Sequence, residues 1–246
     1  MSLRVILLTS FLAVTAGEAS TPFSDSDRRE MLDRFNTALT ELSMKIAISP
    51  DNIPLRSQRG DVFLFLGRFP EAVADYERMI ALDSGQDAPH WRLGIAYSLV
   101  GECLKSAEQF TKYHTFDGRD RENGIWEFLA RARINGIPAA QATMLRYTQF
   151  DREPFPALYE MLAGRKTDAE LLAELSARDL LSDHKVAFFA HYYIGLNQLL
   201  LGNTTSAREH LAKAVQAGWR GSVDENLGYM WQVARVQLEA LKAGER

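Results

Sequence analysis

The chain has 246 residues, of which 46% are hydrophobic and 24% charged, and its formal net charge at pH 7 is -4. This length is enough for one elongated domain or two compact ones, and the acidic balance argues against nucleic-acid binding, which needs concentrated positive charge. The single cysteine excludes an intramolecular disulfide and any zinc or iron–sulfur site built from cysteines.

The beginning of the chain has the pattern of an export signal. Arg4 precedes an apolar run from Val5 to Ala16, and small residues suit cleavage after Ala16 or after Ala19. A helix of that length spans about 18 Å, well short of the roughly 30 Å hydrocarbon core of a bilayer. We therefore predict a cleaved signal peptide over 1–19, with an uncleaved anchor as the alternative. The mature protein is expected to be periplasmic or secreted.

Regularly spaced glycines predict a helical repeat. Pairs seven residues apart occur at Gly60 and Gly67, Gly94 and Gly101, and Gly195 and Gly202. The first two pairs are offset by 34 residues. This period is similar to that of the tetratricopeptide repeat (TPR), in which two antiparallel helices carry the pattern W-x2-L-G-x2-Y, then A-x3-F, then P. No single helical hairpin can bury its apolar face, so such units stack and share one core.

Three segments fit this pattern best, namely 53–86, 87–120 and 188–221. In the second of them Gly94, Tyr97 and Phe110 take the places of the repeat glycine, tyrosine and phenylalanine. The usual tryptophan is replaced by His90 there and by His191 in the last unit. An incomplete unit precedes the three, and no sustained alternation of apolar and polar residues calls for a sheet.

The segment 121–187 is less regular, and we read it as degenerate hairpins. Helices are expected over 123–134 and 139–147, and a short hairpin over 156–163 and 167–177 with Thr167 as its helix cap. A closing helix over 223–243 carries an apolar stripe that should cap the last hairpin. The fold prediction is all-α: a right-handed TPR-like α-solenoid of about five to six hairpins with a C-terminal capping helix, forming one domain over 20–246.

On these motifs the chain is identified as a member of the TPR superfamily. The order of its segments, with the runs Phe188–Gly195 and Leu199–Gly202, resembles the NlpI-like family of envelope TPR lipoproteins. That resemblance implies an adaptor that brings cell-wall hydrolases and a protease together. The chain departs from the family pattern because no cysteine stands near the cleavage region, which argues against a lipid anchor.

A TPR array is curved, and its first helices line the concave side, where a protein or peptide partner is expected to bind. The residues predicted to face this groove are Asp61, Leu64, Trp91, Arg92, Ile95, Ser98, Trp126, Arg133, Tyr192, Leu196 and Leu199. Aromatic and arginine side chains are the usual anchors of an interface. The alternative for Trp91 and Trp126 is packing between hairpins.

No motif points to a reaction centre. The five histidines form no metal-binding pattern, and the chain has no nucleophile elbow, phosphate loop or dinucleotide fingerprint. Acidic clusters such as Asp117–Glu122 are interpreted as helix starts, where carboxylates complement the helix dipole. We predict a non-enzymatic scaffold with no cofactor and no metal. The alternatives are a self-associating envelope subunit and, less favoured, an enzyme of unrecognised type.

Overall fold

The structure is a computed structural model that describes residues 23–219 and 228–244. Within these ranges it is all-helical and contains no strand, which confirms the all-α part of the fold prediction. The predicted signal peptide over 1–19 lies outside the described residues. The helices are α1 (Asp25–Ile48), α2 (Ile53–Phe65), α3 (Phe69–Leu82), α4 (Trp91–Leu99), α5 (Cys103–Phe116), α6 (Arg121–Asn135), α7 (Ile137–Ala142), α8 (Phe155–Leu162), α9 (Asp168–Ala177), α10 (His184–Leu200), α11 (Thr204–Gln216) and α12 (Tyr229–Ala243).

The second glycine of each pair forms the turn of a helical hairpin. Gly67, Gly101 and Gly202 have φ angles of 76°, 85° and 78°, in the left-handed region that residues with a Cβ rarely adopt. These glycines connect α2 to α3, α4 to α5 and α10 to α11. The recurrence of glycine in the sequence therefore reflects the same turn built three times.

The first glycine of each pair lies where the two helices of a hairpin touch. A Cβ added at Gly60 would lie 2.5 Å from the Tyr76 ring, at Gly94 2.7 Å from the Phe110 ring, and at Gly195 2.9 Å from Leu211. In each hairpin the partner side chain comes sixteen residues after the glycine. The three hairpins thus share one local construction, in which a large side chain of the second helix rests on the bare backbone of the first.

The middle segment follows the prediction only in part. Helix α6 and the α8–α9 hairpin form as expected, and Thr167 caps α9 in a reciprocal capping box with Glu170. The helix expected over 139–147 is wrong beyond Ala142, because 143–154 is not helical.

Contacts with other elements account for this non-helical segment. The ring of Tyr147 packs edge-on against His114 and Tyr159, with centroids 5.0 and 5.2 Å away. The carbonyl of Leu145 accepts a hydrogen bond from the Tyr159 hydroxyl at 2.6 Å. These contacts hold the segment against α5 and α8.

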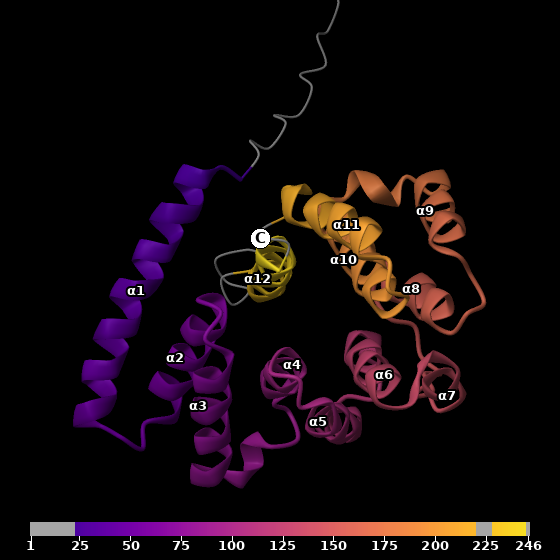
Figure 1. The fold of residues 1–246 in the computed structure, drawn as a ribbon. Helices are drawn as coiled ribbons and strands as arrows, with labels where there is room; N and C mark the ends of the chain where they lie inside the picture. The colour runs from indigo at the N-terminus through magenta and orange to yellow at the C-terminus, as the bar shows by residue number, and fades with distance from the viewer. Residues whose placement is uncertain (1–22, 220–227, 245–246) are drawn as a thin grey trace, which may run out of the picture.

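The closing helix has a larger role than the predicted cap. Figure 1 shows α12 near the centre, with α1 to α3 on one side, α10 and α11 on the other, and α4 below it. Trp231 donates its indole N–H to the Val215 carbonyl of α11, as expected of a cap. Tyr229, however, packs on Phe65 of α2 and on Trp91 of α4, with ring centroids 5.3 and 4.8 Å apart.

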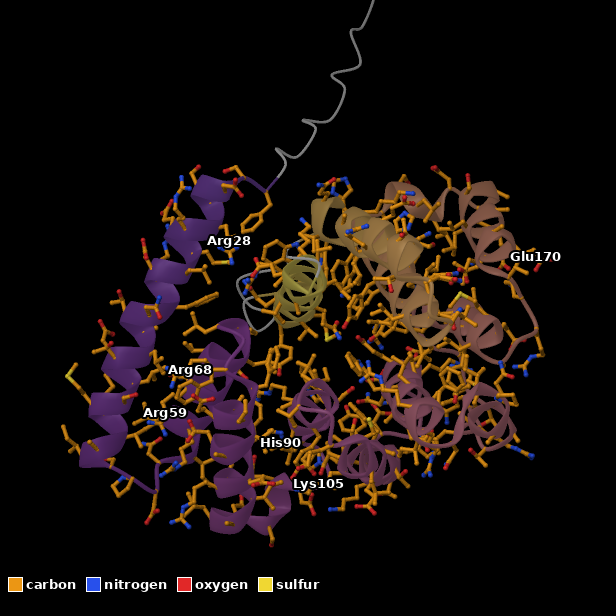
Figure 2. All side chains as sticks on the ribbon, viewed as in Figure 1. Arg28, Arg59, Arg68, His90, Lys105 and Glu170 are labelled. Atoms are coloured by element: carbon orange, nitrogen blue, oxygen red, sulfur yellow. The ribbon has the colours of Figure 1, made fainter. Side chains whose placement is uncertain are left out.

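Both sides of the array are therefore joined through α12. Arg28, on α1 in Figure 2, donates to both carboxylate oxygens of Glu239 at 2.7 and 3.0 Å. The Arg235 guanidinium donates to the Phe65 carbonyl of α2. All eight residues from Tyr229 to Val236 are buried, so this stretch of the helix is enclosed on every side. The prediction that only one apolar face of this helix is buried is therefore wrong, because polar residues of the opposite face are buried as well.

Candidate functional site

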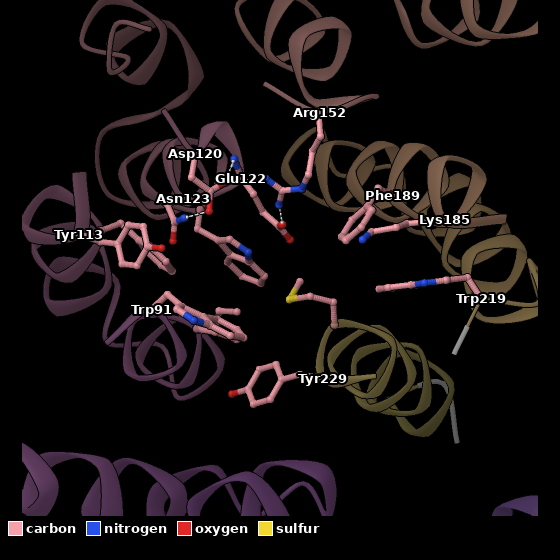
Figure 3. A pocket seen from close by; sticks show the side chains of 14 residues that line it. Trp91, Tyr113, Asp120, Glu122, Asn123, Arg152, Lys185, Phe189, Trp219 and Tyr229 are labelled. Atoms are coloured by element: carbon pink, nitrogen blue, oxygen red, sulfur yellow. Dashed lines mark hydrogen bonds and ion pairs between the residues drawn. The ribbon is translucent and has the colours of Figure 1, made fainter. Parts of the chain in front are cut away.

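A cavity of about 440 Å³ lies beside α12, where five helices from distant parts of the chain converge (Figure 3). Its volume is within the range of about 300–1,000 Å³ that is usual for ligand pockets. The lining residues are Trp91, Ile95, Phe110, Tyr113, Asp120, Glu122, Asn123, Trp126, Arg152, Lys185, Phe189, Trp219, Tyr229 and Met230.

Aromatic rings form most of the apolar wall. The edge of one ring in the Trp91–Tyr229 pair meets the face of the other, whereas Phe110 and Trp126 are stacked with centroids 6.1 Å apart. Such ring pairs hold one another in place. The wall is therefore a preformed surface of aromatic faces and edges.

The polar part of the cavity is an acidic cluster around one guanidinium. Arg152 donates to Glu122 at 2.6 Å, and to Asp120 and Asp151 at 3.2 Å each. The second carboxylate oxygen of Glu122 accepts a hydrogen bond from the Tyr193 hydroxyl at 2.7 Å. Three carboxylates thus share one arginine. In Figure 3 a dashed line joins Arg152 to Glu122, above Trp91 and Tyr229.

Burial raises the pKa of Glu122 to about 7. Arg152 opposes this shift, whereas the neighbouring carboxylates Asp120 and Asp151 add to it. Burial also raises the pKa of Asp120, again against the effect of Arg152. Burial, with a smaller contribution from the neighbouring carboxylates, therefore makes the ionised form of Glu122 costly.

The other charged group on the cavity wall is Lys185, at the beginning of α10. Its ammonium nitrogen lies 5.7 Å from the centroid of the Trp219 ring. In Figure 3 Lys185 is drawn beside Phe189 and Trp219, away from Asp120. The cavity therefore already places one ammonium over an indole, in the arrangement of a cation–π contact.

Three of the predicted groove residues line this cavity: Trp91, Ile95 and Trp126. Trp91 is half-buried, but Trp126 is 2% exposed and stacks on Phe110. Trp126 therefore fits both the groove prediction and the alternative of packing between hairpins, because its side chain belongs to the core and also lines the cavity.

Four others bond to one another outside the cavity. Arg92 donates to Asp61 at 2.6 Å, and Asp61 also accepts from the Tyr76 hydroxyl at 2.6 Å. Arg133 donates to the carbonyl and to the hydroxyl of Ser98, at 3.2 Å each. These side chains tie neighbouring helices together.

The remaining four were expected to be free for a partner, and the structure corrects this for three of them. Leu64 and Tyr192 are 0% exposed, and Leu196 is 3% exposed. The Tyr192 hydroxyl donates to Gln237 of α12 at 2.7 Å, so the protein's own helix takes the place of a partner there. Leu199 is half-buried.

Sequence reasoning missed the acidic part of the cavity. Asp120 is a helix start as interpreted, since it accepts from the Glu122 backbone N–H at 3.0 Å. That interpretation hides the second role of Asp120 and Glu122 as partners of Arg152. Neither Arg152 nor Tyr229 lies in a segment with a repeat signature, so no sequence signal associates them with this acidic pair.

The chain matches no family model, and no curated protein matches it significantly. None of the helices described in the structure has the length and apolar character needed to cross a bilayer.

Proposed function

We propose that this protein is a non-enzymatic, exported TPR-like scaffold that holds a protein partner on the concave side of its helical array. The observation that carries the proposal is the aromatic cavity beside α12, to which α4, α5, α6, α10 and α12 all contribute residues. Aromatic residues in a preformed hollow are the typical anchors of protein recognition.

The partner is proposed to contact only part of the concave side. Trp91 and Trp219 are the half-buried rings of the cavity and remain accessible from outside. The area near Tyr192 is taken by α12. A partner therefore needs a short segment or a few side chains, and not a long helix, to reach the cavity.

Capture from envelope extract, followed by hydrogen exchange on the purified complex, tests this proposal. Trp91→Ala should lose the captured protein, because it removes an accessible anchor. Leu104→Ala, at a leucine on α5 that is 62% exposed and outside the cavity, is the matched control and should keep it. In the wild-type complex the partner should slow amide exchange in α4 and α6 and leave α3 unchanged. Protection confined to α3, or retention by both variants, would refute the concave site.

One feature favours an enzyme, namely the pKa of Glu122 near 7. A general acid or base must reach the proton that it transfers. Both carboxylate oxygens of Glu122 are already engaged, one by Tyr193 and the other by Arg152. These two bonds hold the carboxylate in a fixed position, and each oxygen keeps a lone pair that can accept from a bound cation, so we assign the carboxylate to binding.

A self-associating subunit is the second candidate function, and exposed apolar residues on α1 favour it. Met44 and Ile48 are 59% and 84% exposed and lie one helical turn apart. If copies associate through this face, Ile48→Lys should convert the oligomer to a monomer in light scattering. A wild-type monomer at micromolar concentration would remove this candidate.

A further inference from the structure

We infer that the cavity binds a primary ammonium group carried on an alkyl chain, with the ammonium beside Glu122 and the chain against the aromatic wall. This inference rests on the proposed function and names the chemistry of its contact. Two sources share that chemistry, a lysine side chain of a protein partner and a free alkylamine.

The charges around Arg152 favour a cation over an anion. Glu122, Asp120 and Asp151 all accept from this single guanidinium. The side chains of Glu122 and Asp151 are 12% and 8% exposed, so water does little to balance the excess of carboxylates over the one guanidinium that they share. An added ammonium would reduce this imbalance, whereas an added carboxylate would increase it.

The aromatic wall suits the rest of such a ligand. Trp91, Trp126 and Phe189 offer ring faces and edges to methylene groups. Aromatic side chains also attract a cation that lies over their rings. Lys185 over Trp219 is an example of this contact within the same cavity. The cavity thus has carboxylates at one end and aromatic rings along its wall, within one space of the size of a small ligand.

Glu122 also makes the proposed affinity depend on pH. With a pKa near 7, its carboxylate is partly protonated at neutral pH. A cation prefers the ionised form, so binding should release a proton and strengthen several-fold as the pH rises from 6 to 8. Asp120, Arg152 and Lys185 are the other charged groups that line the cavity, and Asp151 accepts a hydrogen bond from Arg152. Burial raises the pKa of Asp120 as well.

Calorimetric titration of the full-length chain with three six-carbon probes tests the inference. Hexylammonium is the proposed ligand type, 1-hexanol is its neutral counterpart, and hexanoate is its anionic counterpart. We expect hexylammonium to bind at least tenfold more tightly than hexanol, and hexanoate more weakly than both. Equal affinity for hexylammonium and hexanol, or tighter binding of hexanoate, would overturn the inference. This comparison uses the wild-type chain and needs no substitution.

A pair of variants then locates the ammonium. Glu122→Gln should reduce hexylammonium affinity at least tenfold, leave hexanol affinity unchanged and abolish the pH dependence. Glu127→Gln is the matched control, because Glu127 is on the same helix and is buried, but pairs with Arg131 and does not line the cavity. Unchanged hexylammonium affinity in Glu122→Gln would place the ammonium elsewhere and refute the assignment.

The two sources are separated with short blocked peptides. Acetyl-Ala-Lys-Ala-amide should bind more tightly than its norleucine counterpart if the ammonium comes from a partner's lysine. If hexylammonium binds and both peptides bind equally weakly, the ligand is a free amine. Retention of a partner without hexylammonium binding would refute the ammonium inference alone. Hexylammonium binding without a captured partner would refute the scaffold proposal alone.

Discussion

His90 is a residue that has two structural tasks at once. It is the N-cap of α4, where its Nδ1 accepts from the Leu93 backbone N–H at 3.2 Å, and its ring lies 4.9 Å from that of Tyr76. Burial lowers its pKa to about 4, and the positive charge of Arg92 adds to this effect. The folded state therefore requires the neutral ring.

Acidification is expected to destabilise the protein through His90. The unfolded chain binds a proton near pH 6.5 and the folded chain near pH 4, so the free energy of unfolding should fall between these values, by about 2–3 kcal/mol for this group. His90→Asn keeps a capping oxygen without a titrating ring. Urea unfolding at several pH values should show a shallower pH dependence in this variant. An unchanged slope would contradict the assignment.

Glu122 should act in the opposite direction. Its folded-state pKa of about 7 lies above the ordinary value of 4.5, so the folded chain binds the extra proton in this window. The free energy of unfolding of the wild type, relative to Glu122→Gln, should therefore fall by up to about 3 kcal/mol as the pH rises from 4.5 to 7. The same series with Glu41→Gln, on an exposed part of α1, controls for the loss of a surface carboxylate. A constant difference between wild type and Glu122→Gln would disprove the shift.

At the scale of the helical hairpin, stability depends on the close contact at the first glycine. A Cβ at position 94 would lie 2.7 Å from the buried Phe110 ring, which has little room to move. Gly94→Ala should lower the free energy of unfolding by about 1–3 kcal/mol through overpacking. Gly118→Ala is the control, because its new Cβ would come no closer than 3.5 Å to its neighbours.

A second substitution tests the mechanism of that loss. Gly94→Ala with Phe110→Leu should lose less stability than the sum of the two single changes, since the smaller side chain frees space for the Cβ. Chemical denaturation of the four proteins gives this coupling. Strict additivity would show that the glycine is needed for another reason.

Hairpins of this kind were predictable from sequence, and the cavity was not. The positive φ at Gly101 and the close approach of the Phe110 ring at Gly94 both require glycine, so glycine recurs in the sequence at a regular spacing. The position of α12 requires no residue type at a regular spacing, so the sequence does not reveal it. Its stripe of Met230, Trp231 and Ala234 indicates one buried face, but Gln232 and Arg235 are buried as well through bonds to distant residues. The pairing of Glu122 with Arg152 likewise depends on a segment without regular structure.

At the scale of the whole molecule, α12 turns a row of hairpins into a closed arrangement. In a simple repeat array each repeat contacts only the adjacent repeats, so a local disturbance affects only those repeats. Here α12 contacts α1 and α2, near one end, and α10 and α11, near the other (Figure 1). Local unfolding at one end of the array should therefore lower the stability of the helices at the other end.

Arg235 is the residue at which this coupling can be measured. Its guanidinium, in a side chain only 3% exposed, donates to Gln232, to Glu239 and to the Phe65 carbonyl. Arg235→Ala leaves these acceptors without their partner and should cost about 3 kcal/mol. Native-state hydrogen exchange should then speed up by a similar free energy in α2 and in α11, although the two helices are far apart in sequence. Arg34→Ala, at an arginine that pairs with Glu30 on α1 and whose side chain is 76% exposed, should change neither helix. Faster exchange in α12 and α11 alone would mean that the hairpins behave as an open array and that α12 is only a cap.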